Sequence, residues 1–195
     1  MRYLGGGVPS VANAGTGKLK KTVVLVGMMG AGKTAVGRAL ASRLSVPFLD
    51  SDAEIESAAA MTIAEIFARD GEAFFRSRES EIIDRLLRGP CCILSTGGGA
   101  FLSARNRDLI SAKGVSVWLN ADLRLLWSRV KNKDTRPLLR TPDPYRTLRD
   151  LFEARTPIYA KADLAVVSDA SYTIDMMASQ VIAALATRPD VLEVS

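Results

Sequence analysis

The sequence predicts an α/β protein in which a parallel, doubly wound sheet forms the middle of three layers. Five short apolar segments lack strict alternation, which is typical of strands covered on both faces. Segments with a helical pattern separate these strands, and a glycine-rich turn joins the first strand to the first helix. Ligands of such sheets bind beyond the carboxyl ends of the strands, so we expect the functional site there.

The expected elements follow one another along the chain in regular alternation. The strands are Thr22–Val26, Pro47–Asp50, Cys91–Leu94, Val115–Leu119 and Leu164–Val167. The helical segments are Lys33–Leu44, Ile63–Arg69, Ser77–Leu87, Ala104–Ser111, Leu123–Lys131, Thr147–Ala160 and Ile174–Ala186. Capping boxes are expected at Ser51…Glu54 and Thr62…Glu65. The adjacent Cys91 and Cys92 are poorly placed for a disulfide with each other, which favours a buried strand in a reducing compartment.

The length of 195 residues predicts one domain, which we expect at residues 22–188. Residues 1–21, rich in glycine, alanine and serine, are expected to form a flexible basic tail, and residues 189–195 a C-terminal tail. Two long inserts interrupt the alternation, at about residues 51–80 and at about residues 132–144. The second is polar and contains prolines, so we expect a lid there; a plain surface loop is the alternative.

The charge of the chain limits its partners. Of the net charge of +5, residues 1–21 carry +4, which leaves 22 basic and 21 acidic residues in the rest of the chain. A nearly neutral domain predicts no nucleic-acid partner. No apolar run approaches the roughly 18 residues that cross a membrane, and the start lacks the apolar core of a secretory signal. We therefore expect a cytoplasmic protein without a membrane partner.

The strongest motif is the run Gly27-Met28-Met29-Gly30-Ala31-Gly32-Lys33-Thr34, a Gly-x4-Gly-Lys-Thr loop between strand and helix. Backbone N–H groups in such a loop surround a phosphate chain at the positive end of a helix dipole. Lys33 is expected to reach the outer phosphates, and the Thr34 hydroxyl to bind Mg²⁺. The loop therefore predicts a site for a purine nucleotide with Mg²⁺; the nucleotide-binding residues are Gly30, Ala31, Gly32, Lys33, Thr34 and Ala35.

Acidic and glycine residues follow the next two strands. Asp50 and Asp52 leave a strand end on the same side, so that one could hold Mg²⁺ while the other accepts a proton. The chain has no histidine, so a general base must be a carboxylate or a lysine. The triple glycine of residues 97–99 follows Ser95-Thr96 and would let a ligand approach the backbone closely.

Three arginines complete the candidate set: Arg76, Arg136 and Arg155. Planar guanidinium groups bind carboxylates and phosphates in a bidentate way. Any one of them alone is more typical of an ordinary surface residue. Arg76 follows two aromatic residues, and Arg136 lies on the expected lid.

Taken together, these motifs resemble the shikimate kinase family. The phosphate loop, Asp50-Ser51-Asp52, Gly71-Glu72-x-x-Phe75-Arg76, the triple glycine, Arg136-Pro-Leu-Leu and Arg155-x-Pro-x-Tyr occur in the family's order over residues 22 to about 187. The resemblance implies a P-loop, nucleoside-monophosphate-kinase-like fold with sheet order 2-3-1-4-5. It also implies ATP- and Mg²⁺-dependent phosphorylation of the 3-hydroxyl of shikimate, a step of aromatic amino-acid biosynthesis, by a monomer.

The same resemblance implies a role for each matching residue. Asp52 corresponds to the base that binds the shikimate hydroxyls, and Asp50 supports Mg²⁺ together with Thr34. On the donor side, Lys33 and the lid residue Arg136 act on the phosphates, and Arg129 lies against adenine. On the acceptor side, the implied residues are Arg76 and Arg155 as carboxylate clamps, Glu79 as an orienting acid, and the backbone of Gly97, Gly98 and Gly99.

Three other functions remain as alternatives. A gluconate-type kinase, or another small-metabolite P-loop kinase, would also combine this loop with an anionic acceptor. The triple glycine and Arg136-Pro-Leu-Leu argue against the gluconate type, and the Asp-Gly-x-Pro-Arg segment of adenylate kinases is not found. A nucleotide-dependent regulatory module without turnover is the alternative from a different class.

Overall fold

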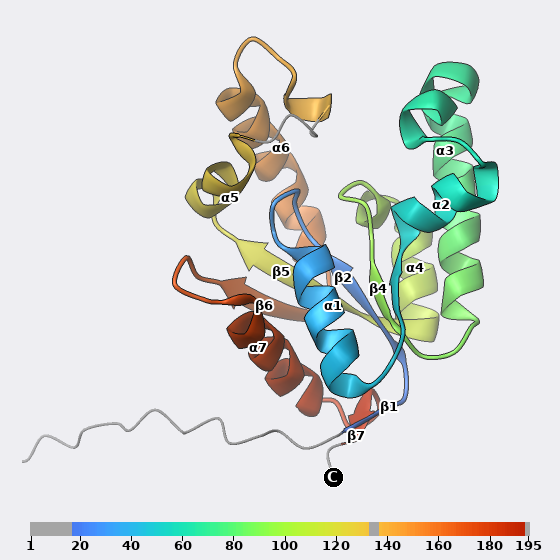
Figure 1. The fold of residues 1–195 in the computed structure, drawn as a ribbon, viewed down its shortest axis with the longest axis vertical. Coiled ribbons are helices and arrows are strands. Elements are labelled where there is room, and N and C mark those ends of the chain that lie inside the picture. The colour runs from blue at the N-terminus through green and yellow to red at the C-terminus, as the bar shows by residue number, and fades with distance from the viewer. Residues whose placement is uncertain (1–16, 133–136, 194–195) are drawn as a thin grey trace, which may run out of the picture.

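The computed structural model describes residues 17–132 and 137–193 and has the predicted α/β architecture (Figure 1). The parallel sheet has the order β3-β4-β2-β5-β6. Its strands are β2 (Thr22–Val26), β3 (Phe48–Asp50), β4 (Ile93–Ser95), β5 (Gly114–Ala121) and β6 (Leu164–Ser168). Counted from β2, this is the order 2-3-1-4-5, so the predicted topology is confirmed.

Helices cover both faces of this sheet. They are α1 (Lys33–Leu44), α2 (Ser51–Ala59), α3 (Ile63–Leu87), α4 (Ala104–Lys113), α5 (Leu123–Val130), α6 (Pro144–Tyr159) and α7 (Ile174–Ala186), with short 3-10 turns at Ala100–Leu102 and Pro137–Leu139. Helices α1 and α7 pack against each other, as do α3 and α4 (Figure 1). Helix α6 begins three residues before its predicted start, because Asp143 caps it and Pro144 suits a first helical position.

Burial explains why the sequence signal of the strands is apolar rather than alternating. All five residues of β2 are buried, as are all three of β4. The edge strand β6 does alternate, with Val167 67% exposed beside buried neighbours. A central parallel strand lies between two helical layers, whereas an edge strand has part of its surface in water.

One predicted capping box is confirmed and the other is wrong. At α3, the Thr62 hydroxyl accepts from the Glu65 N–H, and the Glu65 carboxylate accepts from the Thr62 N–H. At α2 the cap is Asp50, whose carboxylate accepts from the Asp52 N–H at 3.0 Å. Ser51 is buried, and its hydroxyl accepts a hydrogen bond from the distant Gly97 N–H instead.

Helix α3 contains a break that separates the two predicted helices. Gly71 has φ 80° and ψ 173°, a non-helical conformation in the left-handed half of φ space that favours glycine. The predicted segments Ile63–Arg69 and Ser77–Leu87 lie on either side of this kink.

Two short segments outside the predicted domain limits of 22–188 pair with each other. Strand β1 (Lys18–Leu19) pairs antiparallel with β7 (Leu192–Glu193), and Lys21 forms an ion pair with Asp190 at 2.8 Å. Leu19 and Leu192 are buried, with Val191 fully inaccessible. Residues 17–21 and 189–193 of the expected tails are therefore packed on the domain; residues 1–16 and 194–195 lie outside the described residues.

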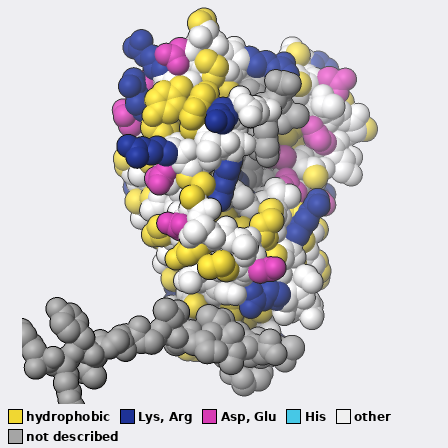
Figure 2. Space-filling view, turned by 60° about the vertical axis from the view of Figure 1, so that its left-hand side comes forward, with side chains coloured by type: hydrophobic (Ala, Val, Ile, Leu, Met, Phe, Trp, Pro, Cys, Tyr) yellow, Lys and Arg dark blue, Asp and Glu magenta, His cyan; other side chains and the backbone are white. Residues whose placement is uncertain are grey.

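Surface charge and hydropathy were also expected to limit the partners of the chain. On the face shown in Figure 2, basic and acidic side chains are interspersed. Within residues 17–132 and 137–193, no helix combines the length and the apolar character that a membrane span requires. Cys91 and Cys92 are both free, and burial raises the pKa of the Cys92 thiol.

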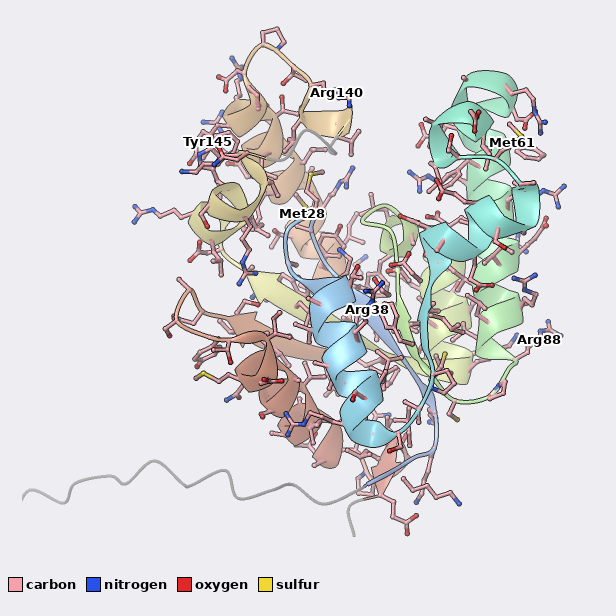
Figure 3. All side chains as sticks on the ribbon, in the orientation of Figure 1. Met28, Arg38, Met61, Arg88, Arg140 and Tyr145 are labelled. Atoms are coloured by element: carbon pink, nitrogen blue, oxygen red, sulfur yellow. The ribbon has the colours of Figure 1, made fainter. Side chains whose placement is uncertain are left out.

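Two helical pairs project beyond the carboxyl ends of the strands. In Figure 3, Arg140 and Tyr145 mark the pair α5–α6, Met61 marks the pair α2–α3, and Met28 marks the glycine-rich loop between them. This arrangement leaves the glycine-rich loop that follows β2 between a projection on either side.

The contact between the two ends of the chain yields a stability prediction. Leu192→Ala removes a side chain that is 2% exposed, so we expect the free energy of unfolding to fall by about 2 kcal/mol or more. Chemical denaturation measures this change, with Val167→Ala at the exposed edge strand as the control. A loss below about 0.5 kcal/mol at Leu192 would mean that β7 adds nothing to the fold.

Candidate active site

The glycine-rich loop joins β2 to α1 and leaves the start of that helix open. Gly30 and Gly32 have φ of 83° and 97°, and a Cβ on Gly30 would lie 2.8 Å from Val130 Cγ1. Gly32 is the N-cap of α1, and no side chain caps the helix there. The N–H groups at this helix start are thus available to a phosphate, where the helix dipole also favours negative charge.

Two cationic side chains are fastened to the carbonyl groups of this loop. Lys33 Nζ donates to the Gly27 carbonyl at 2.8 Å and to the Met28 carbonyl at 3.0 Å. Arg129 Nη1, from α5, donates to the Gly30 and Ala31 carbonyls at 3.2 and 3.4 Å. The cations therefore lie against the loop, with positive charge already placed around the expected phosphates.

The loop forms one wall of a cavity of about 630 Å³. The cavity brings together most of the predicted nucleotide and metal residues: Gly30, Ala31, Gly32, Lys33, Thr34, Ala35, Asp50, Asp52, Gly97, Gly98 and Arg129. Tyr172, Thr173, Ile174 and Met177 line it as well, at the start of α7. Sequence reasoning found no base-contacting residue in this segment, because these four side chains form no recognisable nucleotide-binding motif.

Asp52 lies in this cavity in an environment that favours its protonated form. Burial and the nearby Asp50 raise the pKa of the Asp52 carboxyl, and Lys33 opposes the shift. A Cβ on Gly97 would lie 2.7 Å from Asp52 Oδ1. The carboxylate is thus held directly against residues 97–99, called the glycine loop from here on, and its pKa is above that of an ordinary aspartate.

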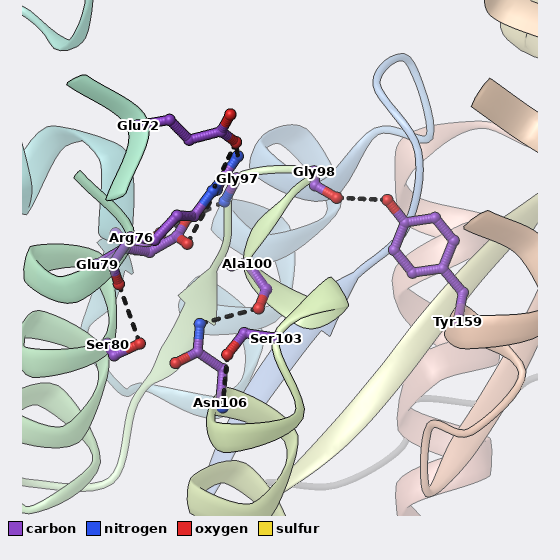
Figure 4. Close-up of polar contacts among 11 residues, drawn as sticks. Glu72, Arg76, Glu79, Ser80, Gly97, Gly98, Ala100, Ser103, Asn106 and Tyr159 are labelled. Carbon is purple, nitrogen blue, oxygen red and sulfur yellow. Dashed lines mark hydrogen bonds and ion pairs between the residues drawn. The ribbon is translucent and has the colours of Figure 1, made fainter. Parts of the chain in front are cut away.

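A second group of charges lies beside Gly99, the last residue of the glycine loop. Arg76 Nη1 donates to both carboxylate oxygens of Glu79, at 3.0 and 3.2 Å, and the guanidinium also bonds Glu72 (Figure 4). Glu79 is 1% exposed; burial raises its pKa, while Arg76 acts in the opposite direction. A Cβ on Gly99 would lie 2.7 Å from the Arg76 guanidinium. The paired acid therefore fixes Arg76 beside the loop.

Helix α6 supplies Arg155, the second predicted carboxylate clamp. A Cβ on Gly98 would lie 3.7 Å from Arg155 Nη1 and 3.8 Å from the Tyr159 hydroxyl. The Tyr159 hydroxyl donates to the Gly98 carbonyl at 2.5 Å. Arg155 thus lies beside Gly98, and Arg76, paired with Glu79, lies beside Gly99. In the described part of the chain, none of these three charged residues lines the nucleotide cavity. Arg136 lies outside the described residues.

Sequence reasoning missed two positions that the structure brings to the site. Tyr159 was read as part of a motif without a role of its own, although a buried tyrosine hydroxyl generally needs a hydrogen-bond partner. Ser51 was read as a helix cap, and its bond to the Gly97 N–H joins residues 46 positions apart. No local pattern predicts such a contact.

The oxygen groups in the cavity fit a hard divalent cation. The Thr34 hydroxyl and the Asp50 carboxylate are oxygen donors, the type that Mg²⁺ prefers. Within the described residues there is no cluster of three or more His, Cys, Asp or Glu side chains that could hold a metal. This donor set fits a cation bound jointly by protein and nucleotide phosphates. Ser95 and Thr96 also line the cavity, although the Thr96 hydroxyl donates to the Leu25 carbonyl.

A phosphate loop, an aspartate pair and a separate arginine site at one sheet edge define a P-loop kinase that acts on a small acceptor. A family model described as shikimate kinase matches residues 29–186. The shikimate kinase of Ruegeria pomeroyi is 69% identical over 183 residues, covering 94% of each chain, and that of Cereibacter sphaeroides is 68% identical over 176 residues, covering 90% of this chain and 88% of its own.

The solved structures agree with the sequence comparisons. The shikimate kinase from Acinetobacter baumannii, in complex with shikimate, is 37% identical with a TM-score of 0.80, covering 86% of this chain and 93% of its own. A gluconokinase from Sinorhizobium meliloti is 18% identical with a TM-score of 0.58, covering 87% and 94%, which reflects the shared fold. The chain belongs to the shikimate kinase family, and its reaction is the ATP-dependent phosphorylation of shikimate.

The contact between Gly97 and Asp52 predicts the effect of adding one methyl group. Gly97→Ala places a Cβ 2.7 Å from Asp52 Oδ1, so the carboxylate must move. If Asp52 acts as the predicted base, moving its carboxylate by about 1 Å costs about 100-fold in kcat. Steady-state kinetics with a thermal melt tests this, and Gly89→Ala, where the nearest atom would be at 3.4 Å, is the control. Wild-type kcat in a folded Gly97→Ala variant would contradict it.

Proposed function

We propose that the chain transfers the γ-phosphoryl group of Mg²⁺-bound ATP to the 3-hydroxyl of shikimate, giving 3-phosphoshikimate and ADP. One observation carries this assignment of the site. Asp52 lies in the nucleotide cavity beside Gly97, and Arg76, which is paired with Glu79, lies beside Gly99 of the same loop. An acceptor held by Arg76 can therefore present a hydroxyl to Asp52 and to the nucleotide at once.

On the donor side, backbone N–H groups from Gly30 to Ala35 bind the phosphate chain, and Lys33 neutralises the outer phosphates. Thr34 and Asp50 would hold Mg²⁺. When bound, Mg²⁺ would supply charge neutralisation on the phosphate oxygens. Arg129, which already donates to the loop carbonyls, lies where it can cover the base. Arg136, on the lid, would approach the phosphates.

On the acceptor side, Arg76 and Arg155 bind the substrate carboxylate, and the backbone of Gly97, Gly98 and Gly99 contacts the bound substrate. Glu79 keeps the Arg76 guanidinium oriented through its two hydrogen bonds. Shikimate has one carboxylate and several hydroxyls, and this combination of arginines, acids and backbone groups matches it.

The transfer balances with one proton acceptor. The shikimate hydroxyl oxygen forms a bond to the γ-phosphorus, while the bond from that phosphorus to the bridging oxygen of ADP breaks. The hydroxyl proton passes to the Asp52 carboxylate. A carboxylate takes this role because the chain contains no histidine. Positioning and charge neutralisation by Lys33 and the arginines supply the larger share of the rate acceleration.

We also propose that the protein is a cytoplasmic monomer that uses neither nucleic acid nor a membrane as a partner. The near-neutral charge of residues 22–195 and the interspersed charges in Figure 2 support the absence of a nucleic-acid partner, and the monomer is what the family resemblance implies. The product would enter aromatic amino-acid biosynthesis. A gluconate-type acceptor is the second enzyme candidate, and the triple glycine and Arg136-Pro-Leu-Leu argue against it. A regulatory module is the candidate of another class, and the candidate base, the lid arginine and both carboxylate clamps argue against that.

A coupled ADP-release assay tests the acceptor. We expect turnover with shikimate and none above background with gluconate or nucleoside monophosphates. Arg76→Ala should raise the KM for shikimate at least about tenfold, because it removes a charge-assisted contact to the carboxylate. Arg78→Ala, at an exposed neighbouring arginine, is the control. If shikimate fails to stimulate ADP release by the wild-type chain, the assignment is wrong.

The raised pKa of Asp52 predicts the shape of the pH profile. Asp52 must be ionised to accept the proton, so activity falls as the pH drops through its pKa, above the usual aspartate range. Asp52→Asn should lower kcat by about 100-fold or more and abolish this acidic limb. Profiles of kcat/KM are compared with those of Asp108→Asn, an exposed aspartate on α4. An unchanged acidic limb in Asp52→Asn would exclude Asp52 as the base.

A further inference from the structure

Tyr159 ends α6 with its side chain turned into the protein, where it is 1% exposed. Its hydroxyl donates to the Gly98 carbonyl at 2.5 Å, a short hydrogen bond (Figure 4). Burial raises the pKa of this phenol, with Arg155 acting in the opposite direction. The hydroxyl therefore keeps its proton at neutral pH and remains a donor.

Arg155 and Tyr159 lie four residues apart on the same face of α6, and both lie close to Gly98. The Tyr159 ring also packs on Trp118 of β5, with ring centroids 6.4 Å apart and an interplanar angle of 26°. Trp118 in turn would lie 3.3 Å from a Cβ on Gly27, the first glycine of the phosphate loop. Tyr159 thus connects the glycine loop to Trp118 of β5, which lies next to the phosphate loop.

The glycine loop has a second attachment on its other side. Ser51 Oγ, at the start of α2, accepts from the Gly97 N–H at 3.3 Å. Helices α2 and α6 belong to the two projections that lie on opposite sides of the phosphate loop (Figure 1). The loop is therefore held from both sides, by one bond to its first glycine and one to its second.

We propose that Tyr159 is a positioning residue for the acceptor: its hydroxyl fixes the Gly98 peptide and, with it, the distance from the glycine loop to Arg155. This inference rests on the proposed assignment of Gly98 and Arg155 to shikimate. Tyr159 does not touch the nucleotide cavity in the described part of the chain. Because Arg155 does not line that cavity either, we expect its influence to fall mainly on acceptor binding, although Gly98 itself borders the cavity.

Tyr159→Phe removes the hydroxyl and keeps the ring and its packing on Trp118. The Gly98 carbonyl then loses its donor, and the loop and Arg155 can drift apart. We therefore expect the KM for shikimate to rise about tenfold, equivalent to about 1.4 kcal/mol, which is within the range for the loss of one hydrogen bond. The KM for ATP should stay within about twofold, and Tm should fall by less than about 4 °C.

The experiment measures both KM values, kcat and Tm for the wild type, Tyr159→Phe and the control Tyr145→Phe, an exposed tyrosine at the start of α6. A direct readout uses a Trp127→Phe background, in which Trp118 is the one tryptophan left. Shikimate titrated against Trp118 fluorescence without nucleotide should show the same tenfold loss of affinity in Tyr159→Phe.

Each outcome decides the inference. A selective loss of shikimate affinity in Tyr159→Phe, absent from Tyr145→Phe, supports it. Unchanged shikimate affinity in Tyr159→Phe overturns it while leaving the proposed function intact. Equal losses for both substrates, or a large fall in Tm, would make Tyr159 a general packing residue and overturn it too. A wild-type chain without shikimate-dependent turnover would overturn the proposed function and this inference together.

Discussion

The close approach of the glycine loop, residues 97–99, to charged side chains is the constraint on which the site depends. Cβ atoms on Gly97 and Gly99 would each lie 2.7 Å from a charged atom, of Asp52 in one case and of Arg76 in the other. A side chain at either position would therefore displace the Asp52 carboxylate or the Arg76 guanidinium. The sheet order explains the geometry: β4 lies between β3 and β2, and the loop that follows it must pass between the residues that end both neighbours.

Electrostatics follows from this crowding. Burial is the largest cause that raises the pKa of Asp52 and of Glu79, and Asp52 adds a smaller upward effect on the pKa of Glu79. Arg76 lowers the pKa of both carboxyl groups, and Lys33 lowers that of Asp52. Breaking such buried pairs is costly, whereas the pairs themselves add little net stability. We infer that these charges are retained for binding and chemistry and not for the fold.

The local parts of the site could be predicted from the sequence, and the long-range parts could not. The phosphate loop and the five strands are encoded in neighbouring residues, through glycine spacing and continuous apolar runs. The predicted capping box of α2 is wrong because the Ser51 hydroxyl accepts a hydrogen bond from Gly97, a residue 46 positions away, and does not cap the helix. The pairing of β1 with β7 joins the two ends of the chain, and no periodicity within two-residue strands reveals it. The roles of the site residues, Arg136 among them, remain predictions.

The two substrates are therefore treated differently by the chain. The donor site is formed mainly by one continuous segment, with Lys33 bonded to carbonyls five and six residues before it. The proposed acceptor site is assembled from α3, the glycine loop and α6, and its geometry depends on how these separate elements meet. Helix α6 is bonded to the glycine loop through the Tyr159 hydroxyl and the Gly98 carbonyl. Helix α2 is bonded to it through the Ser51 hydroxyl and the Gly97 N–H. Changes in packing far from ATP can thus alter recognition of shikimate, while the phosphate loop keeps its own internal bonds.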